Sequence, residues 1–176
     1  ATRQSRRFLS LGILVFLCTN LQLWLRVDAA LYLADSALAD IQKNNIIQAD
    51  AKLSKAHLLA SWDPTYPAIA AEQLITIKDG AANQKDKLAL TEETITYLNS
   101  ALAAAPNDTW LNQYLAVLLL DSNKPEKAEV YAERATVLFP RNSNYTYYTL
   151  GTSYLKQQKV EQAIDVFSLE SLAIPK

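Results

Sequence analysis

A pattern of apolar residues that recurs at a fixed interval constrains the fold of this chain more than any other feature. In each unit, a large residue and a small neighbour are followed by a second small residue and a final proline. The members are Leu115, Ala116, Ala128 and Pro140, and 35 residues later Leu150, Gly151, Ala163 and Pro175. Other apolar residues between them are spaced three and four apart, which places them on one face of an α-helix. The sequence therefore predicts stacked helical hairpins that bury one continuous core.

The composition excludes several other classes of protein. Only three glycines occur in 176 residues, so few positions suit the left-handed backbone that β-hairpins and phosphate-binding or dinucleotide-binding loops need. A single cysteine and a single histidine cannot form a disulfide framework or, by themselves, a structural zinc site. The net charge of -1 provides no basic surplus for nucleic acid. We therefore predict an all-α fold without a nucleic-acid partner, a cofactor or a metal.

The sequence indicates no catalytic residue either. The one histidine, His57, lies beside Leu58 and Leu59 in a predicted helix. A catalytic base would need an oriented nucleophile, and the sequence signals none. We interpret His57 as a structural or surface residue and expect that the chain is not an enzyme.

The repeated residues resemble the tetratricopeptide repeat (TPR), a helix–turn–helix unit of about 34 residues. The last unit fits seven of its signature positions and departs from them at Glu170, where a small alanine is expected. The seven residues are Tyr147, Leu150, Gly151, Tyr154, Ala163, Phe167 and Pro175. The preceding unit lacks the aromatic positions but retains Leu115, Ala116, Ala128, Ala135 and Pro140. Towards the N-terminus the match weakens.

The TPR resemblance implies a right-handed α-solenoid of about four TPR-like hairpins. Small residues are expected where the two helices of a hairpin approach closely, and large ones such as Tyr154 and Phe167 between hairpins. We predict hairpins over about 29–61, 64–104, 107–139 and 143–173. Residues 29–176 then form the TPR-like repeat domain, and residues 1–28 form a separate N-terminal transmembrane helix or signal anchor.

The N-terminal segment from Phe8 to Leu25 contains 18 residues without a charge. As a helix it would be about 27 Å long, close to the thickness of a bilayer's hydrocarbon core. We favour a transmembrane helix, because Trp24 lies at one end and arginines lie at the other. A cleavable signal peptide is a second interpretation. A buried core helix is a third, and it would require hydrogen-bond partners for Asn20 and Gln22.

The arginines also predict an orientation. Arg3, Arg6 and Arg7 precede the uncharged segment, whereas Arg26 alone follows it closely. Because cytoplasmic flanks carry the excess of positive charge, the N-terminus is expected in the cytoplasm. The sequence thus predicts a bacterial inner-membrane protein, anchored through residues 8–25, whose repeat domain is extracytoplasmic.

In TPR arrays the first helix of each hairpin lines a concave groove. Transfer of those positions selects an aromatic and amide-rich set: Trp110, Gln113, Val117 and Leu120 from the third unit, and Tyr145, Tyr148, Thr152 and Lys156 from the fourth. Chaperone-binding TPR domains differ, because their Lys, Arg and Asn residues clamp a C-terminal carboxylate. We expect an extended peptide, a partner helix or a sugar chain in the groove. Alternatively, these aromatic residues only pack between helices.

The order of the segments resembles a second family. An apolar helix, a short hairpin that ends in Ala60-Ser61-Trp62-Asp63-Pro64-Thr65-Tyr66 and then TPR units are similar to the C-terminal part of bacterial O-antigen ligase/polymerase membrane proteins. The resemblance implies the accessory tail of an enzyme that handles lipid-linked glycans, with the catalytic residues upstream of Ala1. The absence of methionine and of a polar capping helix after Phe167 agrees with that expectation. The alternative is a free-standing membrane-anchored or secreted TPR scaffold that assembles an envelope complex.

Overall fold

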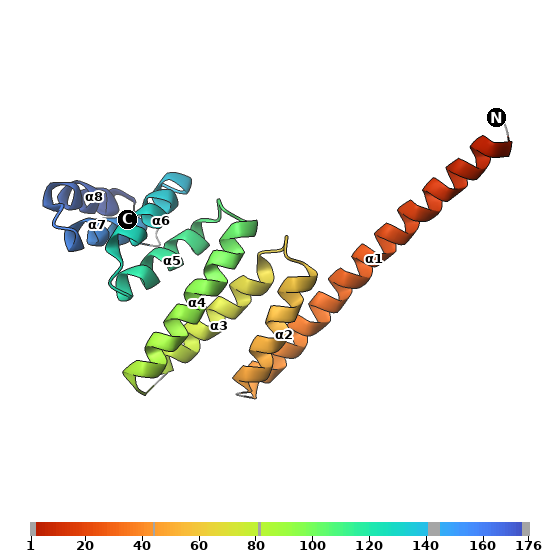
Figure 1. The fold of residues 1–176 in the computed structure, drawn as a ribbon. Coiled ribbons are helices and arrows are strands. Elements are labelled where there is room, and N and C mark those ends of the chain that lie inside the picture. Colours follow the sequence, from red (N-terminus) through yellow and green to blue (C-terminus); the bar gives the residue numbers. More distant parts are fainter. Residues whose placement is uncertain (1–2, 44, 81, 141–144, 174–176) are drawn as a thin grey trace. The chain divides into compact units, whose positions relative to one another are not determined.

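The computed structural model is all-helical over the residues that it describes, 3–43, 45–80, 82–140 and 145–173. These residues form eight α-helices and no strand (Figure 1). The chain divides into two compact units, residues 1–61 and residues 62–176. The first unit contains α1 (Arg3–Gln42) and α2 (Ile46–Leu59). The second contains α3 (Thr65–Gly80), α4 (Gln84–Ala104), α5 (Thr109–Asp121), α6 (Pro125–Leu138), α7 (Thr146–Lys156) and α8 (Val160–Ala173).

In the first unit, α1 is a single helix of 40 residues (Figure 1). We expected the anchor to end at residue 28 and the first hairpin to begin at residue 29, but the helix runs through this point without a break. The physical reason is that no proline or glycine occurs between Ile13 and Gln42, so nothing interrupts the helical hydrogen bonds. The apolar segment and the first helix of the first hairpin are therefore parts of one helix.

Small residues allow α1 and α2 to pack closely. Alanines are buried on both helices: Ala30, Ala34 and Ala37 on α1, and Ala49, Ala56 and Ala60 on or directly after α2. Lys52 crosses between the helices, because its ammonium donates to Ser36 Oγ at 2.6 Å and forms an ion pair with Asp40. His57 is half-buried on α2, and no residue that the structure describes bonds to its Nδ1.

The apolar part of α1 is not a core helix. The side chains from Leu11 to Leu25 are exposed, apart from the half-buried Asn20. The polar side chains of Thr19 and Asn20 both donate to the carbonyl oxygen of Phe16, at 2.9 and 2.8 Å, so they are satisfied within the helix. Within the described part of the chain, α1 alone is long and apolar enough to cross a membrane, a property that it shares with signal sequences.

The second unit consists of three hairpins, α3 with α4, α5 with α6, and α7 with α8 (Figure 1). Its core contains the large buried side chains of Leu98, Leu111 and Leu115. Small residues on α6 let the neighbouring helices approach, since Ala128, Ala132 and Ala135 have no exposed surface. Because these leucines and alanines recur at helical spacing, each helix has one apolar face to bury.

The turns inside the last two hairpins have the same geometry, 35 residues apart. Asn123 and Gln158 both adopt a left-handed backbone, with φ of 55° and 64°. The next residue in each turn, Lys124 or Lys159, donates its N–H to a carbonyl five residues earlier, at 2.8 and 3.0 Å. These bonds satisfy carbonyls at the ends of α5 and α7. The repeat in the sequence is therefore also a repeat in backbone conformation.

Most of the TPR signature residues lie in the core. Leu115, Ala116, Ala128, Ala135, Leu150, Gly151, Tyr154 and Ala163 are buried. Tyr147 is half-buried and donates its hydroxyl to the carbonyl of Pro140, itself exposed, at 3.1 Å. The Phe167 ring packs on Gly151 within the last hairpin, where glycine leaves room for a ring, and against a cluster that includes Ala116 and Ala132 of the preceding hairpin. Pro175 and the predicted start of the fourth hairpin at residue 143 lie outside the described residues.

Candidate functional site

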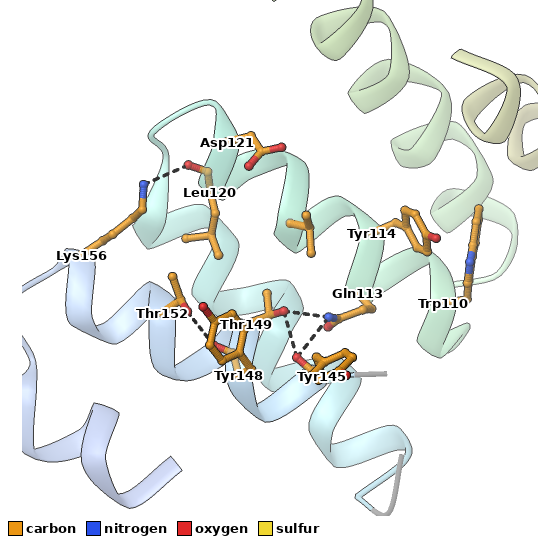
Figure 2. A pocket seen from close by; sticks show the side chains of 11 residues that line it. Trp110, Gln113, Tyr114, Leu120, Asp121, Tyr145, Tyr148, Thr149, Thr152 and Lys156 are labelled. Carbon is orange, nitrogen blue, oxygen red and sulfur yellow. Dashed lines mark hydrogen bonds between the residues drawn. The ribbon is translucent and has the colours of Figure 1, made fainter. Parts of the chain in front are cut away.

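A groove with a cavity volume of about 1120 Å³ lies between α5 and α7 (Figure 2). All eight residues selected from the sequence line it: Trp110, Gln113, Val117, Leu120, Tyr145, Tyr148, Thr152 and Lys156. Three further lining residues were not predicted: Tyr114, Asp121 and Thr149. The structure thus brings the two predicted sets of four together on one surface.

The wall on α5 follows from the helical period. Trp110, Tyr114 and Val117 lie three or four residues apart and line the groove, whereas Leu111 and Leu115 on the opposite face are buried in the core. The ring centroids of Trp110 and Tyr114 are 4.4 Å apart at an angle of 39°. This tilted aromatic pair is a preferred arrangement and gives the wall a defined shape.

The wall on α7 begins with a residue in an unusual conformation. Tyr145 is the N-cap of α7 and has φ of 57° and ψ of 33°, the left-handed region that bulky residues seldom adopt. Its carbonyl oxygen accepts from the N–H and the hydroxyl of Thr149, each at 3.0 Å. Those bonds hold the backbone of Tyr145 while its side chain remains 60% exposed at the groove.

A hydrogen bond between two buried side chains joins the walls at the floor of the groove. The Nε2 of Gln113 donates to Thr149 Oγ1 at 2.7 Å and to the carbonyl of Tyr145 at 3.4 Å (Figure 2). Both side chains are shielded from water, so the bond competes little with solvent. Gln113 therefore fixes the position of α7 against α5.

Tyr148 is supported from behind by α8. Its ring lies 5.8 Å from the ring of Phe167, at 45°. Its backbone N–H, in the first turn of α7, donates to Oε2 of Glu170 at 3.0 Å. The Glu170 side chain is buried and supplies the acceptor that the N-cap residue Tyr145 does not provide. Glu170, which stands where the TPR signature has alanine, thus takes the place of the missing N-cap side chain of α7.

Charged residues lie at one end of the groove. Lys156 donates its ammonium to the carbonyl of Leu120 at 3.3 Å (Figure 2). Asp121 lies at the same end and is paired with Lys78 of α3 at 3.6 Å. This end therefore combines cations and a carboxylate, while the remaining lining is aromatic, aliphatic, amide and hydroxyl.

The three lining residues that were not predicted from the sequence have one explanation in common. Tyr114 and Thr149 lie four residues after Trp110 and Tyr145, and Asp121 lies four after Val117. The transfer selected about one residue per helical turn. Residues three and four positions apart share one face of a helix. The groove is wide enough that residues on the next turn, four positions after the predicted ones, line it as well.

Two titratable groups with shifted pKa values lie outside the groove. Burial raises the pKa of Glu129, but hydrogen bonds from Lys159 at 2.7 Å and Gln157 at 2.6 Å outweigh it, so the pKa lies below its ordinary value. Burial and the hydrogen bond to Glu133 raise the pKa of Tyr154 to about 12. Among the described residues, no group of His, Cys, Asp and Glu side chains could hold a metal ion.

Comparison with known proteins supports the fold. No family model and no curated protein matches the sequence, but solved structures of MamA do match in fold. The structure of MamA residues 41-end from Desulfovibrio magneticus RS-1 has a TM-score of 0.66 and 17% identity, covering 84% of this chain and 77% of that one. A further crystal structure of MamA has a TM-score of 0.64 and 14% identity, covering 82% and 77%.

The fold is TPR-like. This likeness supports the all-helical repeat architecture. At these identities the likeness concerns fold alone.

Proposed function

We propose that the chain is a membrane-anchored TPR interaction module that binds a protein segment in the groove between α5 and α7. The observation that carries the proposal is the placement of four aromatic side chains, Trp110 and Tyr114 on one wall and Tyr145 and Tyr148 on the other. Aromatic residues at interfaces provide large contact areas with little loss of conformational entropy. A groove with aromatic residues on both walls can contact the side chains and the backbone of a bound protein segment.

The exposure of the tyrosines argues against simple packing between helices. Tyr145 and Tyr148 are 60% and 57% exposed, whereas a residue that only fills space between helices is buried. The same groove suits a sugar chain less well. Sugar recognition requires many hydrogen-bonding groups at the surface, and here Gln113 and Thr149 bond to each other at 2.7 Å. We therefore favour a protein segment over a glycan.

A site-specific photocrosslinker tests this function in cells. Benzoylphenylalanine replaces Val117, which lines the groove, or Val130, which is exposed on α6 away from it. We expect a defined adduct from position 117 and none from position 130. The added substitutions Tyr145→Ala and Tyr148→Ala should abolish it without loss of helical circular dichroism. An adduct that survives both substitutions contradicts the proposal, and mass spectrometry of the adduct distinguishes a peptide from a glycan.

The membrane anchor is the second part of the proposal. Its support is the exposed apolar surface of α1 from Leu11 to Leu25, with arginines before it and the acidic body of the chain after it. Retention of the intact chain in membranes after alkaline extraction is expected. A mature N-terminus near Ala29 would instead identify a cleaved signal peptide. Activity of alkaline phosphatase fused after the repeat domain reports the expected extracytoplasmic location.

The context of the module is the third part. We propose that it is the accessory tail of a lipid-linked-glycan ligase or polymerase, on the resemblance carried by the Ala60–Tyr66 segment. The alternative is a free-standing anchored scaffold that assembles an envelope complex. The reading frame upstream of Ala1 separates them. Ten or more apolar spans in that frame support the accessory tail, whereas a start codon directly before Ala1 supports the scaffold.

A further inference from the structure

A second, smaller hollow adjoins the groove. It has a volume of about 410 Å³ and lies between the first helices α3 and α5. Its lining on α3 includes Thr65, Ile69 and Glu72, which share one helical face. Trp110 lines this hollow as well as the main groove. The two depressions therefore meet at the Trp110 side chain and offer one path across three first helices.

The two ends of this path each offer a charge of opposite sign outside the described ion pairs, because Asp121, which lies at the Lys156 end, is already paired with Lys78. At the α7 end, no carboxylate of the described residues lies within ion-pair distance of Lys156, and its ammonium bonds to a main-chain carbonyl. Lys78, by contrast, is paired with Asp79 and Asp121. At the α3 end lie two carboxylates, Glu72 and Asp108.

The carboxylates at the α3 end are differently engaged. Asp108 caps α5, because its Oδ1 accepts from the N–H of Leu111 at 2.9 Å. The exposed Glu72 forms no ion pair within the part of the chain that the structure describes. Glu72 and Lys156 are thus two charges at opposite ends of the path that a ligand can neutralise.

We propose that the groove and the hollow form a single surface for an extended peptide of defined polarity. An acidic residue of the peptide pairs with Lys156, aromatic or aliphatic residues contact the aromatic walls, and a basic residue beyond Trp110 pairs with Glu72. This inference rests on the proposed function and adds the chemical class and direction of its ligand. From Trp110 to Asp121 the helix rises about 16 Å, the length of roughly five extended residues, so at least five residues separate the two peptide charges.

Selection from a library of random dodecapeptides tests the polarity. The probe is the phage-displayed library, and the bait is the full chain in nanodiscs. Wild-type selections are expected to enrich peptides with one acidic and one basic residue that flank an aromatic or aliphatic stretch. The best peptide should bind Lys156→Glu about tenfold more weakly, and exchange of its acidic residue for lysine should restore binding. Glu72→Lys should likewise weaken binding, and exchange of the basic residue of the peptide for glutamate should restore it.

A matched variant controls for net charge. Lys127→Glu makes the same change at an exposed lysine of α6 that lines neither depression, and it should bind the selected peptide as wild type does. Absence of any enriched peptide overturns both the proposed function and its polarity. Enriched peptides that require Tyr148 but bind Lys156→Glu and Glu72→Lys unchanged overturn the polarity alone and leave the interaction function standing.

Discussion

Gly151 and Phe167 are in such close contact that no other residue fits at position 151 without rearrangement. A Cβ atom at Gly151 would lie 2.5 Å from Cε1 and 2.7 Å from Cδ1 of the Phe167 ring. Contacts this short are repulsive, so either the ring or the helix would have to move. The glycine thus permits α7 and α8 to pack with an aromatic ring between them.

Gly151→Ala is expected to destabilise the second unit through this contact. Overpacking costs about 1–3 kcal/mol, and the better helix propensity of alanine offsets about 1 kcal/mol of it. The free energy of unfolding, measured by chemical denaturation, should therefore fall by up to about 2 kcal/mol. In a Phe167→Leu background the ring is absent, and the same change should be neutral or stabilising.

Gly80→Ala is the matched control. A Cβ at this position, the last residue of α3, meets nothing within 4 Å. The substitution should not reduce stability, because it removes the conformational freedom of glycine without a clash. Equal losses for the two alanine variants, or an equal loss in the Phe167→Leu background, would contradict the steric explanation.

Glu170 is expected to protect the first turn of α7. Its carboxylate accepts from the N–H of Tyr148 at 3.0 Å, and loss of a capping acceptor costs about 1 kcal/mol. In Glu170→Ala the Tyr148 amide should exchange its hydrogen roughly fivefold faster, which corresponds to that energy. Glu170→Gln retains an acceptor oxygen and should show a smaller change, whereas unchanged exchange in Glu170→Ala would refute the capping role.

The Gln113–Thr149 bond is expected to couple α5 to α7 energetically. A double-mutant cycle of Gln113→Leu and Thr149→Val should give an interaction energy of about 1 kcal/mol in unfolding experiments. Thr152→Val is the control partner, because the Thr152 hydroxyl donates to Tyr148 within its own helix, at 2.7 Å. A cycle of Gln113→Leu with Thr152→Val should show no coupling. Comparable values in the two cycles would mean that the bond does not join the helices.

The parts of the fold that were predictable from sequence depend on local periodicity. Buried positions such as Leu115 and Ala128 recur at helical spacing and at the repeat interval. The register of the groove residues follows from the same interval, which is why Trp110 and Tyr145 could be placed on facing first helices. The handedness of the stack and the ligand of the groove stay predictions.

The features that were not predictable depend on contacts between distant residues. Glu170 differs from the alanine of the signature, and only its position beside the N–H of Tyr148 reveals a cap. The left-handed backbone of Tyr145 is likewise stabilised by Gln113, 32 residues away in sequence. The continuity of α1 was missed for a different reason. Arg26 and Asp28 mark the end of the uncharged apolar segment, but charged residues do not break a helix.

Tyr154 is expected to make the folded chain less stable at alkaline pH. It is one of nine tyrosines. Burial of its side chain, together with the hydrogen bond that its hydroxyl donates to Glu133 at 2.8 Å, raises its pKa to about 12 from an ordinary 10. The folded chain therefore holds this proton more tightly than the unfolded chain does. Its contribution to stability is fully present below about pH 10 and is lost as the pH rises towards about 12.

Titration of phenolate absorbance measures this shift directly. In the wild type, a component with a pKa near 12 should ionise late for as long as the chain stays folded, and Tyr154→Phe should lose the absorbance of one phenolate from this late component. The same variant should show a smaller loss of stability between about pH 10 and 12, because it has no proton to release there. Tyr114→Phe, at a partly exposed ring of the groove, should leave the late component in place. A late component that persists undiminished in Tyr154→Phe would assign the shift to another residue.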